Sequence, residues 1–503
     1  MSVSEHYEVA VLGGTLSATI ISAILAQRGY RGILIDQGEL SKNHSSGIFD
    51  LSIQDEASAA MQKIHEELKL GSPTSRQGAL SDTILQVVYP DERLDVLRSR
   101  PKFVNELSRA SSKAQTGNLE EFFLSVDQLE QETSSLLETI GTVPPHGFFA
   151  KRSFDVAARR HRSTAQTLNS SDLLLDTPSS FQLLVEGLAP FISYLDVRDI
   201  EDLSQPAFVR PLARLLRGIA PHSSHPTSRT VFVKSALQSG FEVKNDAANG
   251  IVARGRQFEI NLANSRRTVS CDYLVDASSD HSGIDVLPQK LIKSLARTIQ
   301  AMRPNASLHT LTFEVNTRVI PPGMERLVLL MNGRKKNREQ DEEEPKERGI
   351  LLIKEPISGS EGGSTSRVRI TALYPMSAAE EHVSKKVDKI IKARIQRLIP
   401  FLKDGDPRIR SLFEDSKPSQ KTTENLFHPL YNLERLGYLG FENVSSTTAV
   451  KNVYLGGPAI LPGLGVEGEY LSSFQLCDEL DRKTRNIKHP KELGKRLTDV
   501  TYT

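Results

Sequence analysis

"VLGGTLSAT", residues 11–19, follows one short apolar run and opens a second, longer one. The run over 7–12 predicts a strand, and the apolar spacing over 16–28 predicts a helix. A further apolar run over 32–35 completes a β-α-β unit. A glycine pair between strand and helix is the context in which backbone amides bind phosphate, so the stretch predicts a nucleotide-binding turn.

The turn departs from the dinucleotide pattern G-x-G-x-x-G at its second glycine. Gly13, Thr15 and Ala18 take the three glycine places, so a side chain stands where backbone approaches the diphosphate. The Thr15 hydroxyl is able to donate a hydrogen bond to a phosphate oxygen. Asp36 stands about 20 residues further on, where an acid accepts hydrogen bonds from ribose hydroxyls. On this motif alone, a plain strand-to-helix turn stays open as the alternative.

Composition limits the classes of function. A chain of 503 residues predicts two or three packed units. Lys and Arg (63) balance Asp and Glu (62), which argues against nucleic acid or an anionic membrane as the main partner. Cys271 and Cys477 show no disulfide or metal-ligand spacing, so we expect a reducing compartment and no bound metal.

The targeting signals point to the same compartment. We expect no secretion signal, and no apolar run approaches the roughly 20 residues that span a bilayer. The sequence therefore predicts a cytoplasmic protein. Peripheral contact with a membrane stays open.

In the middle of the chain, a helical pattern of apolar residues is followed by a β-rich pattern. Residues from about 55 to 225 are mainly helical in pattern, most clearly over 119–141 and 179–195. From near 229, short β-rich pieces joined by turns form a meander that ends in a strand over 267–278. These patterns predict a helical region followed by a return to the first sheet.

A second sheet is predicted further along the chain. Four strand-like runs over 308–375 indicate an antiparallel sheet, and the apolar stripe over 377–402 indicates a helix packed on a core. The mixed-charge run 333–349 has nearly equal numbers of acids and bases, so we interpret it as a solvated hairpin loop.

The C-terminal stretch 452–480 repeats the strand, glycine loop and helix order of the N-terminus. A strand over 453–455 enters "GPAILPGLGVEG", and a helix follows from about Val466. This stretch resembles the C-terminal flavin-binding motif of the FAD-dependent phytoene desaturase and amine oxidase superfamily. The positions in register with that motif are Gly457, Pro462, Gly463, Gly465 and Gly468. A glycine-rich loop serving only a tight crossover is the structural alternative.

The resemblance extends over nearly the whole chain, including the meander and the segment 89–97. It implies an α/β fold with a discontinuous Rossmann-like FAD-binding domain of the glutathione-reductase type and a second domain of antiparallel sheet plus helices. The implied boundaries are 1–75, 226–300 and 440–503 for the FAD domain, 76–225 for a helical part, and 301–439 for the sheet and helix of the substrate domain.

The resemblance also implies roles for individual residues. The diphosphate would contact the first turn, the adenosine ribose would contact Asp36, and the flavin ring would lie beside the C-terminal glycines. Where the superfamily has a Gly-Gly pair after the second strand, this chain has only Gly47, and Lys42 is best interpreted as a solvated lysine. The predicted cofactor-binding residues are Gly13, Gly14, Thr15, Leu16, Asp36, Gly47, Gly457, Pro462, Gly463, Gly465 and Gly468.

The activity implied is that of an FAD-dependent oxidoreductase, a dehydrogenase, desaturase or isomerase that moves hydride from a hydrophobic small molecule to flavin. His428 is a candidate catalytic residue, with a structural loop histidine as the alternative; His44 and His146 are weaker candidates. A flavin-free carrier on the same architecture is the alternative function. An NAD-dependent dehydrogenase using only the first unit leaves the C-terminal loop unexplained. An enzyme should tolerate no side chain at Gly465, whereas a carrier should tolerate one.

Overall fold

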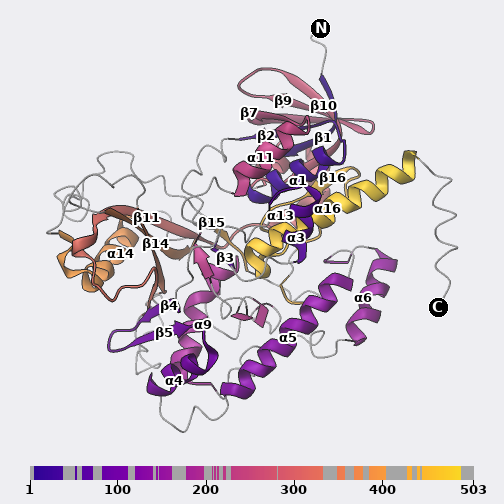
Figure 1. Ribbon diagram of the computed structural model, residues 1–503. Coiled ribbons are helices and arrows are strands. Elements are labelled where there is room, and N and C mark those ends of the chain that lie inside the picture. Colours follow the sequence, from indigo (N-terminus) through magenta and orange to yellow (C-terminus); the bar gives the residue numbers. More distant parts are fainter. Residues whose placement is uncertain are drawn as a thin grey trace.

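The computed structural model in Figure 1 describes most of the chain. The described residues are 5–37, 51–53, 59–71, 82–110, 119–139, 143–145, 147–160, 177–197, 207, 209–210, 212–213, 219–221, 228–279, 281–331, 348–356, 367–377, 384–403, 428–432, 439–441 and 444–488. Several sequence predictions lie outside them, namely those on Lys42, His44, Gly47, His146 and all but the last two residues of the charged loop over 333–349.

The first sheet is assembled from three separate segments of the chain. Its strand order is β7-β2-β1-β10-β9-β8, and β16 also pairs with β10. The β1, β2, β7, β10 and β16 pairings are parallel, while β9 pairs antiparallel with β10 and β8. The strands are β1 Glu5–Leu12, β2 Gly32–Asp36, β7 Glu242–Asn245, β8 Ala248–Arg254, β9 Gln257–Leu262, β10 Thr268–Asp276 and β16 Val453–Leu455.

Apolar residues on both faces hold this sheet inside the molecule. Along β1, Val9 and Val11 point into one core while Ala10 and Leu12 point into another, and all four are fully buried. Continuous apolar strands of this kind are typical of parallel sheets covered on both faces. The face that carries Val9 and Val11 is covered by four helices (Figure 1), namely α1 (Leu16–Gln27), α3 (Ala59–Glu67), α11 (Ser228–Gln238) and α16 (Gly465–Lys488).

The predicted second sheet has seven strands, in the order β15-β11-β14-β13-β12-β4-β5. All its pairings are antiparallel except that of β12 with β4. Helix α14 (Ser384–Leu398) buries Ile391 and Ile395 in the core beneath it. The strands are β4 Thr83–Val88, β5 Arg93–Leu97, β11 Ala306–Asn316, β12 Leu327–Leu330, β13 Ile350–Pro356, β14 Arg367–Ser377 and β15 His428–Leu430.

Two expectations change here. Residues 83–97 were predicted within a mainly helical region, but they form the hairpin of β4 and β5, because Leu94 and Val96 alternate with polar residues along β5. His428 was predicted in a loop, but it begins β15 and pairs in register with Leu308 of β11. Its catalytic role stays a prediction.

The helical region contains the two helices that the periodicity predicted most clearly, α5 (Leu119–Thr139) and α9 (Ser179–Ile192). Phe103, Phe123 and Phe181 bring α4, α5 and α9 together in one aromatic cluster. The remaining elements are α4 Arg100–Ala110, α6 Phe148–Arg160, α12 Ser282–Asp285, α13 Gln289–Ala301, the short pair β3 Leu51–Ile53 and β6 Ile219–Pro221, and 3-10 turns at Thr317–Val319, Pro400–Lys403 and Pro462–Leu464. Among the described residues, none of the helices combines the length and apolar character needed to cross a membrane.

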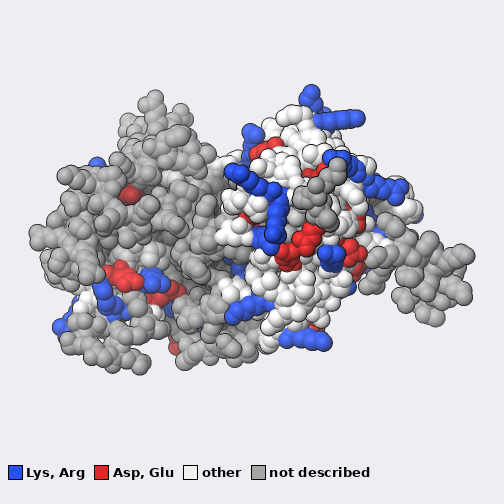
Figure 2. All heavy atoms as spheres, turned by 90° about the horizontal axis from the view of Figure 1, so that it is seen from above, with Lys and Arg blue, Asp and Glu red and all other residues white. Residues whose placement is uncertain are grey.

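The described surface carries charges of both signs. On the face in Figure 2, the Lys and Arg side chains of the described residues lie next to Asp and Glu side chains. Ion pairs among the described residues include Arg254 with Glu259 and Arg482 with Glu479.

Candidate functional site

The carboxyl ends of four parallel strands meet at one edge of the first sheet. The amide of Gly13, just after β1, donates to the carbonyl of Ile35 in β2 at 2.9 Å. The amide of Ala277 donates to Leu12 at 2.9 Å, and that of Gly456 donates to Asp276 at 2.8 Å. The N-terminal turn and the C-terminal glycine loop therefore share this edge, where open α/β sheets bind ligands.

Gly13 is required by the backbone itself. Its φ is +107°, and a Cβ atom there would stand 2.5 Å from the backbone nitrogen of Ser278. Only glycine adopts this φ readily and allows so close an approach. The first glycine of the motif is therefore structural here, because it lets β1 turn beside the end of β10.

Thr15 caps helix α1, and its hydroxyl contacts the backbone just after β10. Its Oγ1 accepts from the amide of Ala18 at 3.2 Å and donates to the carbonyl of Ala277 at 2.6 Å. The Thr15 hydroxyl thus donates to the residue just after β10, and its expected donation to a phosphate oxygen stays a prediction. A capping threonine satisfies one of the unpaired amides at a helix start. The substitution of the second glycine ties helix α1 to the neighbouring strand.

Asp36 lies where the sequence predicted, as the last residue of β2 at the same edge. The residue is buried, and its carbonyl accepts from the amide of Asp246 at 3.0 Å. Its register partner on β7 is Asn245. Binding of a ribose by Asp36 stays a prediction.

The C-terminal glycines pack against protein backbone. Gly465 has φ +55°, and a Cβ there would lie 2.6 Å from the carbonyl oxygen of Ile192. A Cβ on Gly468 would lie 2.2 Å from the carbonyl oxygen of Leu461, and Gly463 is equally close to Phe441. The proposed distinction at Gly465 therefore fails, because a side chain is excluded there in an enzyme and in a carrier alike.

The loop itself is held by two further backbone contacts. Pro462 accepts from the amide of Tyr194 at 2.8 Å, and Gly463 donates to Phe441 at 3.0 Å. Gly457 has φ +95° and lies beside Ser278. These contacts connect the loop to the end of α9 and to β10.

A buried carboxylate contacts the start of helix α1. Glu469, in the first turns of α16, is 5% exposed. One of its oxygens, Oε2, accepts from the Ser17 amide at 3.1 Å and from the Ser17 hydroxyl at 3.0 Å, and Oε1 accepts from the Tyr194 hydroxyl at 3.0 Å. The free amides at a helix N-terminus favour an anion, and here the anion is a side chain of the same protein.

Arg229 adds positive charge to this cluster. Its Nη1 donates to the carbonyl of Gly14 at 3.2 Å, so the guanidinium lies against the glycine turn. Burial raises the pKa of Glu469, while the hydrogen bonds from Ser17 and Tyr194 and the charge of Arg229 act to lower it. Only Lys42 was considered from the sequence as a base for this region, so Arg229, beside the glycine turn, was missed.

A second buried acid fixes the same turn of α16. Glu467 accepts two hydrogen bonds from Arg210, from Nε at 2.8 Å and from Nη2 at 2.7 Å, so the pair is bidentate. Arg210 also donates to Ser134 at 2.6 Å and lies 3.4 Å from Glu130 on α5. Both acids were missed in the sequence, although two acids within a glycine-rich, apolar stretch were the available signal.

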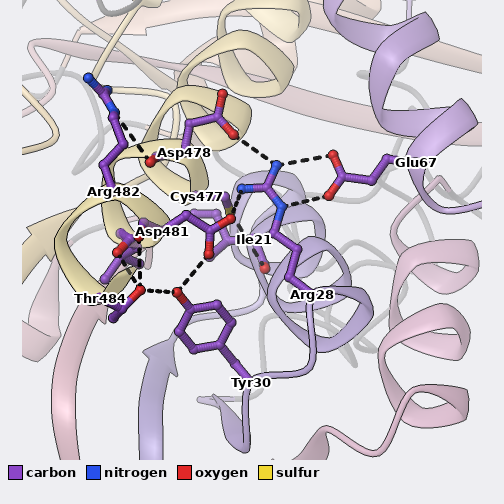
Figure 3. Close-up of polar contacts among 10 residues, drawn as sticks. Ile21, Arg28, Tyr30, Glu67, Cys477, Asp478, Asp481, Arg482 and Thr484 are labelled. Atoms are coloured by element: carbon purple, nitrogen blue, oxygen red, sulfur yellow. Dashed lines mark hydrogen bonds and ion pairs between the residues drawn. The ribbon is translucent and has the colours of Figure 1, made fainter. Parts of the chain in front are cut away.

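At the other end of helix α1, Arg28 joins three acids (Figure 3). Its guanidinium contacts Glu67 on α3 at 2.6 Å, and Asp478 and Asp481 on α16 at 2.9 and 3.1 Å. Tyr30 donates to Asp481 at 2.7 Å. A cation at a helix C-terminus is favoured by the helix dipole, so this network secures α1 against α3 and α16.

Comparisons with known proteins identify the fold. No protein-family model matches the sequence, and no curated protein matches it. An oxidoreductase from Methanosarcina mazei is similar in structure with a TM-score of 0.54 at 9% identity, over 94% of this chain and 100% of the other. A triple mutant of putrescine oxidase is similar with a TM-score of 0.53 at 11% identity, over 95% and 99%. Wild-type putrescine oxidase bound to putrescine gives 0.52 at 11% identity, over 95% and 99%.

These similarities cover nearly the whole chain, so this chain has the same overall fold as that oxidoreductase and putrescine oxidase. The α/β architecture predicted from the two glycine motifs is confirmed. The Rossmann-like sheet and the second, antiparallel sheet with helices, which the resemblance implied, are likewise present in this chain. The individual cofactor contacts and the domain boundaries stay predictions.

The donors at the sheet edge fit an anion such as the diphosphate of FAD. They comprise the first amides of α1, the hydroxyls of Ser17 and Tyr194, and the guanidinium of Arg229. In the arrangement described above, however, Glu469 already accepts from Ser17 and Tyr194. These donors suit a diphosphate, but in this structure Ser17 and Tyr194 donate to the carboxylate of Glu469.

Proposed function

We propose that this protein is an FAD-dependent oxidoreductase. The observation that supports the proposal most strongly is the likeness to oxidases over nearly the full chain, at a TM-score above 0.5. The glycine turn after β1, Asp36 at the end of β2 and the glycine loop after β16 lie at one sheet edge, in agreement with it. When bound, FAD supplies the two-electron acceptor of the reaction.

The protein's own residues would then bind and orient the cofactor. The turn at Gly13 and Gly14, with Arg229 beside it, would hold the diphosphate, and Asp36 would accept from the ribose. The glycine-rich loop that ends in Gly465 would approach the flavin side.

The substrate in this proposal is a hydrophobic small molecule, and the resemblance to desaturases and amine oxidases supports that choice. A cytoplasmic location belongs to the proposal as well. It is supported by Cys271 and Cys477, which are both buried free thiols, as expected in a reducing compartment.

Peripheral contact with a membrane is a further part of the proposal. At the start of α6, Phe148 and Phe149 are 71% and 84% exposed. Lys151 and Arg152, exposed in the next turn, supply positive charge. Exposed aromatic residues with adjacent bases suit the interface of an anionic bilayer.

The test of the cofactor is the visible absorption spectrum of the purified protein with and without added FAD. We expect a flavin band shifted from that of free FAD, and release of FAD on denaturation. If FAD neither co-purifies nor binds in excess, to the wild type or to a variant lacking the Glu469 carboxylate, the oxidoreductase proposal is wrong.

A second candidate function is a flavin-free binding protein on the same fold. The contact of Glu469 with the start of helix α1 favours it, because this carboxylate satisfies donors that a diphosphate would use. This candidate expects no flavin spectrum and no change in melting temperature with FAD.

A further inference from the structure

We infer that Glu469 is a built-in competitor of the cofactor, and that FAD binds only when this carboxylate leaves the donors at the start of helix α1. The inference rests on the proposed function and deepens it, because it assigns to one residue of this chain the control of cofactor binding.

The geometry supports a specific contact. Both Glu469 oxygens accept hydrogen bonds, at 3.0 to 3.1 Å, from Ser17 and Tyr194. Ser17 is fully buried and Tyr194 nearly so, so water does not replace these bonds without some opening of the site. The carboxylate thereby holds together α1, α16 and the end of α9.

The charges explain why the two anions exclude each other. A diphosphate at this turn would place negative charge beside a buried carboxylate, where the low local dielectric makes like charges repel strongly. The guanidinium of Arg229 lies against the turn. The donors at the start of helix α1 therefore serve one anion at a time.

Replacing Glu469 with a smaller side chain should leave the first turn of α16 in place, because neighbouring residues fix that turn. It sits one residue after Gly468, whose missing side chain lets α16 approach Leu461 closely, and Glu467 keeps its own partner, Arg210. The first turn of α16 therefore stays fixed when the carboxylate at 469 is removed.

The experiment compares the wild type, Glu469→Ala and Glu469→Gln, with Glu479→Ala as a control at a partly exposed position of the same helix. The probes are inorganic pyrophosphate, followed by melting temperature, and FAD, followed by its absorption spectrum. We expect pyrophosphate to raise the melting temperature of Glu469→Ala and to leave the wild type and Glu479→Ala unchanged. We expect FAD to bind Glu469→Ala at least about tenfold more tightly than the wild type, because the like charge is gone.

Glu469→Gln separates charge from space and remains informative if the alanine variant does not fold. Its amide oxygen still accepts from Ser17 but carries no charge, so we expect FAD affinity between those of the wild type and Glu469→Ala. Equal FAD affinity in the wild type and both variants would overturn the inference and leave the proposed function standing.

Two other outcomes separate the proposals. If pyrophosphate stabilises Glu469→Ala but FAD does not bind it, the competitor role holds and the FAD proposal fails. If folded Glu469→Ala and Glu469→Gln respond to neither probe, the competitor role is overturned as well.

Discussion

The two ends of helix α1 are both joined to α16 by charged groups, but in opposite ways. At the C-terminal end, the cation lies on α1, as Arg28, and two of the acids lie on α16 at half-buried to exposed positions. At the N-terminal end, the anion lies on α16, as Glu469, and the donors lie on α1. Each arrangement suits the dipole of helix α1.

The difference lies in burial and in place. The network around Arg28 lies away from the ends of the parallel strands, so we assign it to packing alone (Figure 3). The contact of Glu469 with Ser17 is fully buried and lies at the edge where the carboxyl ends of the parallel strands meet, which is the proposed cofactor site. The same physical device, an ion at a helix end, therefore stabilises one end of α1 and controls a ligand site at the other.

The largest loss of stability should come from Arg210→Met, which removes the buried partner of Glu467 on α16. It leaves Glu467 and Glu130 buried without their cation, and breaking such a pair costs about 3–5 kcal/mol in the free energy of unfolding. Urea denaturation measures it. The double variant Arg210→Met with Glu467→Gln should recover part of the loss, since one uncompensated charge is removed. A loss below about 1 kcal/mol would contradict the assignment of Arg210 as the anchor of this turn.

A smaller effect is expected from Arg28→Met, at the other end of α1. Its partners are partly exposed, so water and salt screen the charges, and we expect a loss of about 1–2 kcal/mol. Arg28→Lys, which keeps the charge without the bidentate geometry, should lie between the two. Urea denaturation at low and high salt is the measurement. If the loss equals that of Arg210→Met, the contrast between an exposed and a buried network does not hold.

The smallest effect is expected from Thr15→Ala, beside the Glu469 contact. It removes the cap on the Ala18 amide and the bond to Ala277, for a loss of about 1 kcal/mol. Thr15→Ser keeps the hydroxyl and should remain within a few tenths of a kcal/mol of the wild type. The melting curves of the two variants decide the role. Equal losses in both would mean that the methyl group of Thr15, and not its hydroxyl, is what matters.

Local patterns were sufficient for the parts of the fold with strong periodicity. The unit formed by β1, α1 and β2, and the strand and helix at the C-terminus, follow from apolar spacing and glycine position, which depend on neighbouring residues alone. The hairpin of β4 and β5 was missed because its strands are short and lie within a mainly helical region. Pairing with β12, far along the chain, makes them strands.

The sequence by itself determined the fold class of this protein, because two glycine motifs, each between a strand and a helix, specify an α/β sheet with both turns at one edge. Only the tertiary structure decided which groups of the protein form hydrogen bonds at that edge. Thr15 donates to Ala277, just after β10 and more than half the chain later, and Glu469 contacts Ser17 from helix α16. Such contacts depend on which distant segments pack side by side. Burial then strengthens each hydrogen bond and each interaction between charges, because the local dielectric is low.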